Sequence, residues 1–175
     1  MTLSCGCPEQ YPDWHEQDMD LGGQPVHTLS IPTLIHMPLA YEAYLARQQR
    51  LIESLGLDEQ WPRLVLTRTG VFRGAIMRLL KPTTSPAPRI TIMPRPFNVR
   101  AVLHHGDIGT IRKTVQAMQM ALVDAGKVPK ELYLCHLTCP HCRDDRGGDK
   151  MLLLRRWQES PSLARRLRTK SPVSF

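Results

Sequence analysis

Three of the five cysteines, Cys135, Cys139 and Cys142, fall within eight residues of one another, and the other two are Cys5 and Cys7. Two residues separate Cys139 from Cys142, a spacing that lets both thiolates bind one cation. Cys5 and Cys7 are two residues apart, so in an extended segment their side chains point the same way. We therefore predict that Cys5, Cys7, Cys139 and Cys142 form a tetrahedral metal site that joins the N-terminus to the far end of the chain.

Zinc is the metal that this ligand set favours, because four thiolates suit it and it needs no assembly machinery. The cysteine spacing matches no common iron–sulfur run, although a cluster remains an alternative. Cys135, His136 and His141 lie in the same stretch and are reserve ligands.

Three other interpretations of the cysteines stay open. Cys139 and Cys142 could form a redox dithiol, but that motif usually opens a helix, whereas Pro140 and the following Asp and Gly residues indicate a loop. Structural disulfides need an oxidising compartment. Residues 1–21 contain acidic residues and no apolar core, so we expect no signal peptide and a cytoplasmic location. The thiols could also be unrelated and buried.

Charge is distributed unevenly along the 175 residues. The net charge is +7, but residues 155–175 contain six Lys and Arg and one Glu, which leaves only +2 for residues 1–154. The basic character thus belongs to the C-terminal tail, and we expect nucleic acid as a partner only through that tail. No apolar run approaches the length of a membrane span, so we expect no membrane partner.

The order of predicted elements repeats. Residues 1–25 form a polar N-terminal arm, residues 26–80 a first half, residues 81–89 a Pro-rich linker and residues 90–157 a second half. Each half contains a strand, then a helix (39–55 or 107–125) that ends at Gly56 or Gly126, then two further strands. We predict an α+β fold of duplicated βαββ units, with an antiparallel sheet, two helices on one face and a cleft between the halves. Residues 158–175 form a basic tail, which we expect to be disordered.

Four short segments resemble the gyrase-inhibitor-like (SOUL-type) small-molecule-binding fold. In the second half these are VRAVLHHGDIG (99–109) and VPKELY (128–133), which follow the His-x-Gly, long helix and Glu-x-Tyr order of that family. IHMPLAY (35–41) and VFRGAI (71–76) resemble a cysteine-bearing bacterial branch of the fold, whose members are often labelled hydrolases. The cysteine cluster and the basic tail depart from the usual family pattern.

The resemblance implies a cleft that takes planar or cationic hydrophobic compounds. It implies that Glu131 meets the charge of the ligand or acts as an acid or base, and that Tyr133 acts with it in relatives that hydrolyse strained cyclic compounds. We therefore name Glu131 and Tyr133 as catalytic candidates, and Tyr41, Phe72, His104 and Glu131 as ligand-binding candidates. The plainer interpretations are a solvated Glu131, a packed Tyr133 and a His104 that bonds the start of the next helix.

We conclude from the sequence that the chain binds a small hydrophobic or cationic molecule and holds a structural zinc, with hydrolysis as an elaboration. A closed four-thiolate site leaves no open position for substrate, so zinc is not expected to be the catalyst. The alternative is a zinc-stabilised adaptor or nucleic-acid-binding protein that acts through the tail. A thiol redox protein is the third interpretation.

Overall fold

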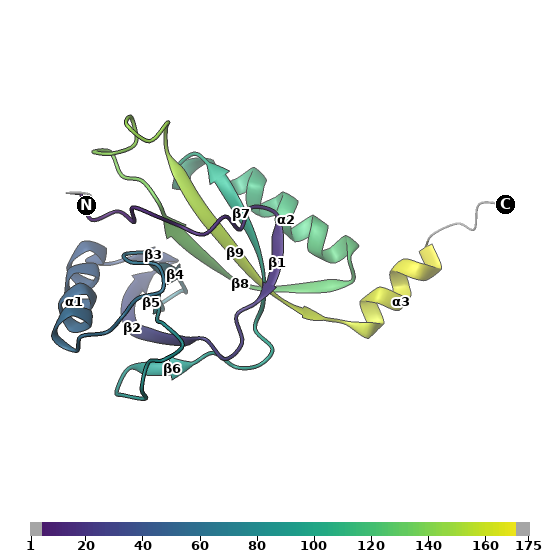
Figure 1. Ribbon diagram of the computed structural model, residues 1–175. Helices are drawn as coiled ribbons and strands as arrows, with labels where there is room; N and C mark the ends of the chain where they lie inside the picture. Colours follow the sequence, from purple (N-terminus) through teal and green to yellow (C-terminus); the bar gives the residue numbers. More distant parts are fainter. Residues whose placement is uncertain (1–4, 171–175) are drawn as a thin grey trace.

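An antiparallel sheet forms the centre of the structure, a computed structural model that describes residues 5–170 (Figure 1). Across the sheet the strands follow the order β1, β7, β9, β8, β4, β5, β2 and β3, and β6 pairs with β2. The strands are β1 (Gln17–Asp20), β2 (Pro25–Leu34), β3 (Met37–Pro38), β4 (Leu66–Arg68), β5 (Arg73–Leu79), β6 (Ile90–Ile92), β7 (Asn98–His105), β8 (Lys127–His136) and β9 (Lys150–Glu159). The helices are α1 (Tyr41–Ser54), α2 (Arg112–Asp124) and α3 (Pro161–Lys170). The predicted α+β class is confirmed.

Two copies of a strand–helix–strand–strand unit build the middle of the sheet. The first copy is β2, α1, β4 and β5, and the second is β7, α2, β8 and β9. From the centre outward their strands follow the same order, β4–β5–β2 and β8–β9–β7. The copies meet where Thr67 of β4 lies opposite Leu134 of β8. This is the duplicated βαββ arrangement that the sequence predicts.

Both α1 and α2 pack on the same face of the sheet, which we call the helix face. Residues opposite one another in antiparallel strands share a face, and one row runs through Ile76, Thr67, Leu134, Leu153 and Val102. Ile76 lies in a cluster with side chains of α1, whereas Leu153 lies in a cluster with side chains of α2. The expectation of two helices on one face is therefore correct.

The opposite face of the sheet, the arm face, carries the largest buried cluster, which includes Leu66, Leu152 and Leu154. The N-terminal arm crosses this face and then pairs as β1 with β7 (Figure 1). Trp14 of the arm meets Trp61 edge to face, with 6.5 Å between ring centroids. Because the arm covers apolar surface of the sheet, it is part of the fold. With the arm on this face, a cleft between the two halves can open only on the helix face.

Several boundaries differ from the predicted ones. The predicted helix 107–125 begins instead with a 3-10 turn, Ile108–Thr110, since the Asp107 carboxylate accepts a hydrogen bond from the Gly109 N–H at 3.0 Å. From the sequence we expect strands at residues 131–138 and 151–154. Strand β8 begins at Lys127, four residues before the first of these, because its first residues pair with the end of β9. Strand β9 runs to Glu159, five residues beyond the second.

The tail that we expected to be disordered contains helix α3, which projects beyond the sheet (Figure 1). Ser160 N–H donates a hydrogen bond to the Gly126 carbonyl at 3.3 Å, and Ala164 approaches the same glycine. This close approach fixes the start of the helix. Residues 171–175 of the tail lie outside the described residues. Among the helices described, none has the length and apolar character to span a bilayer.

Candidate metal centre and adjoining pocket

Four cysteines from the two ends of the chain converge at one point. The Sγ atoms of Cys5, Cys7, Cys139 and Cys142 all lie within 4.8 Å of one another. The Sγ atoms of Cys139 and Cys142 are 3.9 Å apart. A tetrahedral zinc–thiolate centre with bonds of about 2.3 Å requires sulfurs about 3.8 Å apart. The residues present therefore fit a tetrahedral metal ion, and the predicted convergence is confirmed.

The loop between β8 and β9 places its two cysteines through a tight turn. The Cys142 N–H donates to the Cys139 carbonyl at 3.1 Å, and the Arg143 N–H donates to the same oxygen at 3.0 Å. The Cys139 N–H points at the Cys142 sulfur at 3.4 Å. Backbone N–H groups directed at sulfur stabilise a thiolate. The two-residue spacing thus produces the geometry that we predict from it.

The N-terminal pair reaches the site by a different geometry from the one expected. We expected an extended segment, but Gly6 between the two cysteines has a φ of +78°. This left-handed conformation suits glycine, which has no Cβ. The turn at Gly6 brings Cys5 and Cys7 to one side of the chain, toward the loop.

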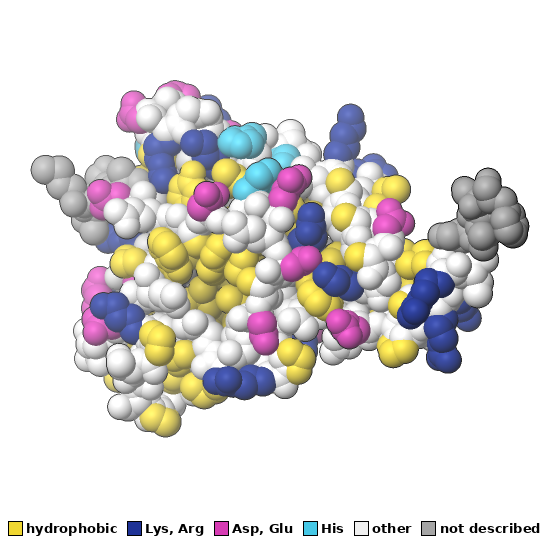
Figure 2. Space-filling model, turned by 45° about the vertical axis from the view of Figure 1, so that its right-hand side comes forward, with side chains coloured by type: hydrophobic (Ala, Val, Ile, Leu, Met, Phe, Trp, Pro, Cys, Tyr) yellow, Lys and Arg dark blue, Asp and Glu magenta, His cyan; other side chains and the backbone are white. Residues whose placement is uncertain are grey.

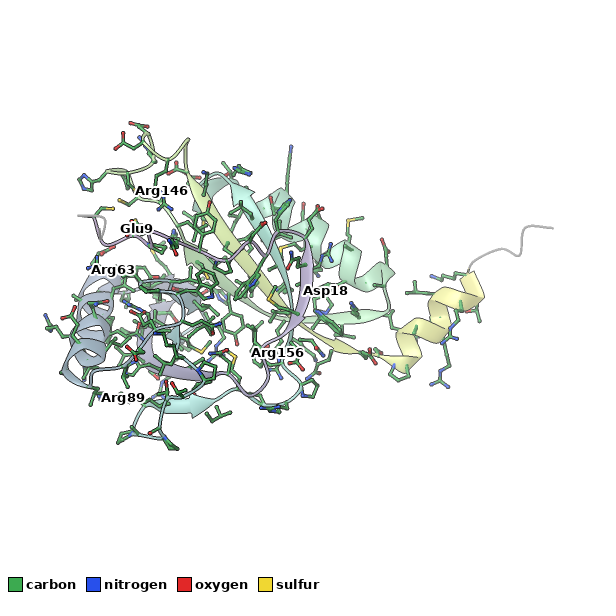
Figure 3. All side chains as sticks on the ribbon, in the orientation of Figure 1. Glu9, Asp18, Arg63, Arg89, Arg146 and Arg156 are labelled. Carbon is green, nitrogen blue, oxygen red and sulfur yellow. The ribbon has the colours of Figure 1, made fainter. Side chains whose placement is uncertain are left out.

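Arg146 fixes the arm beside the cysteines, a role that the sequence does not reveal. Its Nη1 donates to the Pro8 carbonyl at 2.9 Å and to the Leu137 carbonyl at 2.7 Å. The guanidinium also lies over the Tyr11 ring, 5.8 Å from its centroid. Figure 3 shows Arg146 next to the arm. The loop therefore holds the arm by hydrogen bonds as well as by the cysteines.

The thiols of this cluster shift one another's pKa values in opposite directions. The Cys7 backbone N–H, which points at the Cys5 sulfur, lowers the pKa of Cys5 to about 7. Burial and the neighbouring thiols raise the pKa of Cys7. Neighbouring sulfurs cannot all carry negative charge without a cation between them. The cluster thus has the electrostatic character of a cation site.

None of the three reserve ligands belongs to the four-sulfur cluster. Cys135 is completely buried on the arm face, where burial raises the pKa of its thiol. His136, the next residue, points to the opposite face because side chains alternate along a strand. His136 and His141 line the pocket that adjoins the cysteines.

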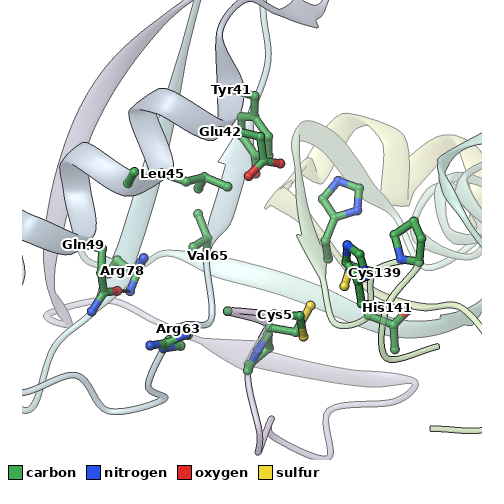
Figure 4. Close-up of a pocket in the computed structure, with 17 residues that line it drawn as sticks. Cys5, Tyr41, Glu42, Leu45, Gln49, Arg63, Val65, Arg78, Cys139 and His141 are labelled. Carbon is green, nitrogen blue, oxygen red and sulfur yellow. Dashed lines mark hydrogen bonds between the residues drawn. The ribbon is translucent and has the colours of Figure 1, made fainter. Parts of the chain in front are cut away.

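A pocket of about 720 Å³ lies between α1 and the cysteine loop, so the two halves of the fold form its opposite walls (Figure 4). From α1 it receives Tyr41, Leu45 and Gln49, which are spaced four residues apart and share one face of the helix. The remaining lining residues are Cys5, Gly6, Cys7, Pro8, Glu42, Ala46, Arg63, Val65, Arg78, His136, Thr138, Cys139, Pro140 and His141. The metal centre is thus a wall of the pocket.

Aromatic and hydroxyl groups meet at the inner side of the pocket. The Tyr41 hydroxyl and the Thr67 Oγ1 share a hydrogen bond of 2.5 Å, and burial raises the pKa of Tyr41. The Tyr41 ring lies edge to face with His136, 6.4 Å between centroids. Although the His136 ring is open to the pocket, desolvation by the surrounding walls lowers its pKa, and the Glu42 carboxylate opposes this shift. His136 is therefore a neutral base near pH 7.

A buried ion pair closes the far end of the pocket. Arg78 Nη1 lies 2.8 Å from Glu59 Oε1 and donates to Gln49 Oε1 at 2.9 Å. The side chains of Arg78 and Glu59 are only 4% and 8% exposed. Each charge neutralises the other, so Arg78 contributes little net charge to the pocket.

The two catalytic candidates lie together but outside the pocket. Tyr133 packs in the arm-face core, 6.1 Å from the Phe97 ring, and burial raises the pKa of its hydroxyl. Glu131 is two residues before it, and its Oε2 lies 3.5 Å from Arg156 Nη1. Their two-residue spacing places them on one face, as expected, but that face is the opposite one from the pocket.

The four ligand-binding candidates are not brought together. Tyr41 lines the pocket, whereas Phe72 is 72% exposed in the β4–β5 turn. His104 is buried against α2, where its ring nitrogens bond the hydroxyls of Thr114 (2.8 Å) and Thr110 (2.9 Å). The sequence analysis named His136 only as a reserve metal ligand, and it did not name Glu42 or Val65, although all three line the pocket. The spacing of residues 41, 45 and 49 along one helix face was the available signal.

A family model matches most of the chain. The model of a family described as "Bacterial hydrolase" matches residues 2–156, which include the cysteine cluster and both halves. The chain belongs to this bacterial hydrolase family. No curated protein matches the chain.

The chain shares its fold with two solved structures. The crystal structure of the EcmrR C-terminal domain has a TM-score of 0.59 and 9% identity, over 82% of this chain and 97% of that domain. The cryo-EM structure of the EcmrR–DNA complex in EcmrR-RPo has a TM-score of 0.56 and 10% identity. The match covers 82% of this chain and 56% of that one. At such identities the likeness concerns the fold alone.

Proposed function

We propose that the protein is a small-molecule-binding domain of the gyrase-inhibitor-like (SOUL-type) fold and that its binding site is the pocket between α1 and the cysteine loop. The observation that carries this proposal is the position of the pocket. It lies at the junction of the duplicated halves, has the volume of a ligand site, and is lined by apolar and polar groups from both halves.

The metal of the cysteine centre is a structural zinc. Four sulfurs that lie within 4.8 Å of one another support this assignment, and the ion would supply folding energy and fix the arm against the loop. A centre closed by Cys5, Cys7, Cys139 and Cys142 offers no open position to a substrate. Reduced thiolates need a reducing environment, so we also propose a cytoplasmic location.

The charges around the pocket favour a hydrophobic cation. A zinc ion with four thiolates has a formal charge of −2, and Glu42 adds another negative charge. Arg63 supplies one positive charge to the lining, whereas Arg78 is neutralised by Glu59. The walls formed by Tyr41 and Leu45 would contact the apolar body of such a ligand.

Metal content is the first measurement, by mass spectrometry on protein purified without a histidine tag, with counting of reactive thiols. We expect about one zinc per chain and a Cys135 thiol that reacts only after unfolding. Absence of metal, with five reactive or paired thiols, would contradict the structural zinc and leave the redox interpretation.

Ligand binding is tested on the zinc-loaded protein by calorimetry with tetraphenylphosphonium, and with triphenylphosphine oxide as a neutral probe of similar shape. We expect the cation to bind more tightly. Glu42→Gln should weaken its binding about fivefold, equivalent to about 1 kcal/mol. The matched control is Glu131→Gln, which removes a carboxylate from the opposite face. Equal loss in both variants would contradict the assignment of the pocket.

Hydrolysis in the same pocket is the second candidate function, favoured by the family match. Because Glu131 and Tyr133 lie on the arm face, we propose that His136 is the general base there and takes a proton from the attacking water. An activated ester such as p-nitrophenyl acetate tests this. His136→Asn should lose turnover and Glu131→Gln should keep it. The reverse result would restore Glu131 as the catalytic candidate.

Nucleic acid binding through α3 is a third possibility, since one of the similar structures is an EcmrR–DNA complex. Figure 2 shows Lys and Arg side chains gathered at this end of the molecule. Among the ion pairs between described residues, none involves the four cations of α3, which are Arg165, Arg166, Arg168 and Lys170. Fluorescence anisotropy with duplex DNA at several salt concentrations tests this. Binding that persists after neutralisation of these four residues would contradict it.

A further inference from the structure

Exposed apolar side chains concentrate at one place in the fold. Among the described residues, ten large apolar side chains are exposed, and six of them lie in two neighbouring segments. These segments are the β2–β3 hairpin and the β4–β5 turn, joined by the Ile35 N–H to Val71 carbonyl bond (2.8 Å) and the Thr33 N–H to Phe72 carbonyl bond (3.1 Å). We call this surface the apolar tip; its members are Leu34, Ile35, Met37, Leu39, Val71 and Phe72.

The backbone of the apolar tip is strained. Leu34 pairs with Met37, so the hairpin turns at two residues, Ile35 and His36, with φ values of +47° and +65°. Such a turn favours Asn-Gly, because both residues adopt positive φ. A β-branched residue is unfavourable there, yet Ile35 occupies this turn and is 75% exposed. The Ile35 side chain is exposed, so its packing does not offset the strain of the backbone. Backbone strain that no packing offsets points to a function for the side chain.

The two chain segments that form the apolar tip, and the residues that flank them, carry cations but no acidic side chains. The sequence contains no Asp or Glu between residues 26 and 41 or between residues 60 and 89. Arg68 and Arg73 flank the β4–β5 turn, and both are exposed. In a symmetric dimer through this surface the arginines of the two copies would approach one another, which is unfavourable. An apolar surface with flanking cations is instead complementary to a negatively charged lipid surface.

We propose that the apolar tip is a peripheral binding site for an anionic lipid bilayer. Ile35, Met37 and Phe72 enter the boundary between headgroups and acyl chains, while Arg68 and Arg73 contact lipid phosphates. Exposed apolar side chains on a hairpin need no complementary pocket in the partner, so a bilayer interface fits them. From the sequence we expected no membrane partner, because no apolar run is long enough to span a bilayer. The apolar tip is built from two short segments that are far apart in the sequence, so it does not appear as an apolar run.

Co-sedimentation of the zinc-loaded full chain with vesicles tests the proposal, with phosphatidylcholine–phosphatidylglycerol vesicles compared with phosphatidylcholine alone. We expect binding to the mixed vesicles. The variant Ile35→Asn/His36→Gly gives the turn its preferred residues, so its thermal midpoint should rise while vesicle affinity falls at least about tenfold. Phe72→Ser is the second variant and should also lose binding. Ile92→Asn and Met120→Gln, which change exposed apolar side chains elsewhere, are the matched controls and should bind normally.

Four results would overturn the proposal. One is no sedimentation with either kind of vesicle. The second is full vesicle binding by Ile35→Asn/His36→Gly. The third is loss of binding only when the cations of α3 are neutralised. The fourth is a dimer in analytical ultracentrifugation that becomes monomeric in Ile35→Asn/His36→Gly, which would assign the surface to a second copy of the chain.

Discussion

The two halves of the sheet use the same scaffold for different purposes. In the second half α2 packs on the sheet through apolar side chains such as Met118 and Val115. In the first half α1 sends Gln48 into a buried polar network, where its Nε2 donates to the His27 carbonyl at 3.2 Å and to the Ile76 carbonyl at 3.2 Å. The hairpins differ as well. The β4–β5 turn forms part of the apolar tip, whereas the β8–β9 loop carries two metal-site cysteines.

The comparison indicates how a duplicated fold acquires a site. Both halves bury polar groups beside their helix. In the second half His104 is bonded to two threonine hydroxyls away from the pocket, whereas the first half places Gln49 and Arg78 in the pocket lining. The pocket needs both, because α1 forms one wall and the cysteine loop of the second half forms the other. The predictions below separate these contributions.

The largest effect should follow removal of the metal centre. Cys139→Ser/Cys142→Ser should lose the metal and at least about 4 kcal/mol of unfolding free energy, the scale of a link that closes so long a loop. Urea unfolding and metal analysis measure this. Limited proteolysis should cut the arm first, because the metal no longer ties Cys5 and Cys7 to the loop. Cys135→Ala is the control: it should lose stability as a core substitution but keep its metal, and loss of metal in that variant would contradict the four-sulfur assignment.

The next effect concerns the buried ion pair of the first half. Glu59→Ala leaves the Arg78 charge buried without a partner, which should cost about 3–5 kcal/mol. Urea unfolding measures the loss. Asp18→Ala is the control, because Asp18 pairs with Lys127 and Arg100 near the surface and should cost at most about 1 kcal/mol. If Glu59→Gln/Arg78→Met is no more stable than Glu59→Ala, the unpaired Arg78 charge is not the cause of the lost stability.

Truncation of one apolar residue on each helix should separate stability from binding. Met118→Ala on α2 should cost about 2–4 kcal/mol of unfolding free energy and leave affinity for tetraphenylphosphonium unchanged. Leu45→Ala on α1, a half-buried pocket residue, should cost less stability but weaken ligand binding. Chemical unfolding and calorimetry on both variants check this. Equal effects of the two variants on affinity would show that the halves are not specialised.

The smallest effect is a pH dependence of stability, to which His27 of the first half contributes beside His136 of the second half, whose pKa is also lowered. Burial, with Arg89 and Arg78 nearby, lowers the pKa of His27 below its ordinary value of 6.5. The unfolded chain therefore binds a proton more readily than the native protein, so stability should fall as the pH falls below about 6.5. In His27→Gln the free energy of unfolding, measured with urea across this pH range, should depend less on pH than in the unchanged protein. The control His105→Gln, at an exposed histidine, should behave as the unchanged protein does.

The fold and the metal cluster could be predicted from the sequence because their signals are local and periodic. The Cys139–Cys142 spacing, the helix ends at Gly56 and Gly126, and the repeated element order need no knowledge of distant contacts. The convergence of Cys5 and Cys7 with the loop follows from the preference of a metal for four thiolates.

The pocket was harder to predict because it depends on which face of each strand meets which helix. One residue separates Cys135, which is buried on the arm face, from His136, which lines the pocket. The Glu131–Tyr133 pair shares a face, as its spacing requires, but spacing alone does not tell which face becomes the cleft. The role of Arg146 depends on carbonyl groups of the arm and the loop, which have no sequence signal.

The metal centre also has a consequence for synthesis of the chain. Cys7 and Cys139 are 132 positions apart in the sequence. On the ribosome Cys5 and Cys7 emerge before the duplicated units, but Cys139 and Cys142 emerge only after the first unit and the second as far as β8 have been translated. The site therefore closes only after most of both units has been made, and a chain that stops short of Cys139 has no means of closing it. Metal occupancy thus distinguishes molecules that extend past Cys142 from those that stop before it.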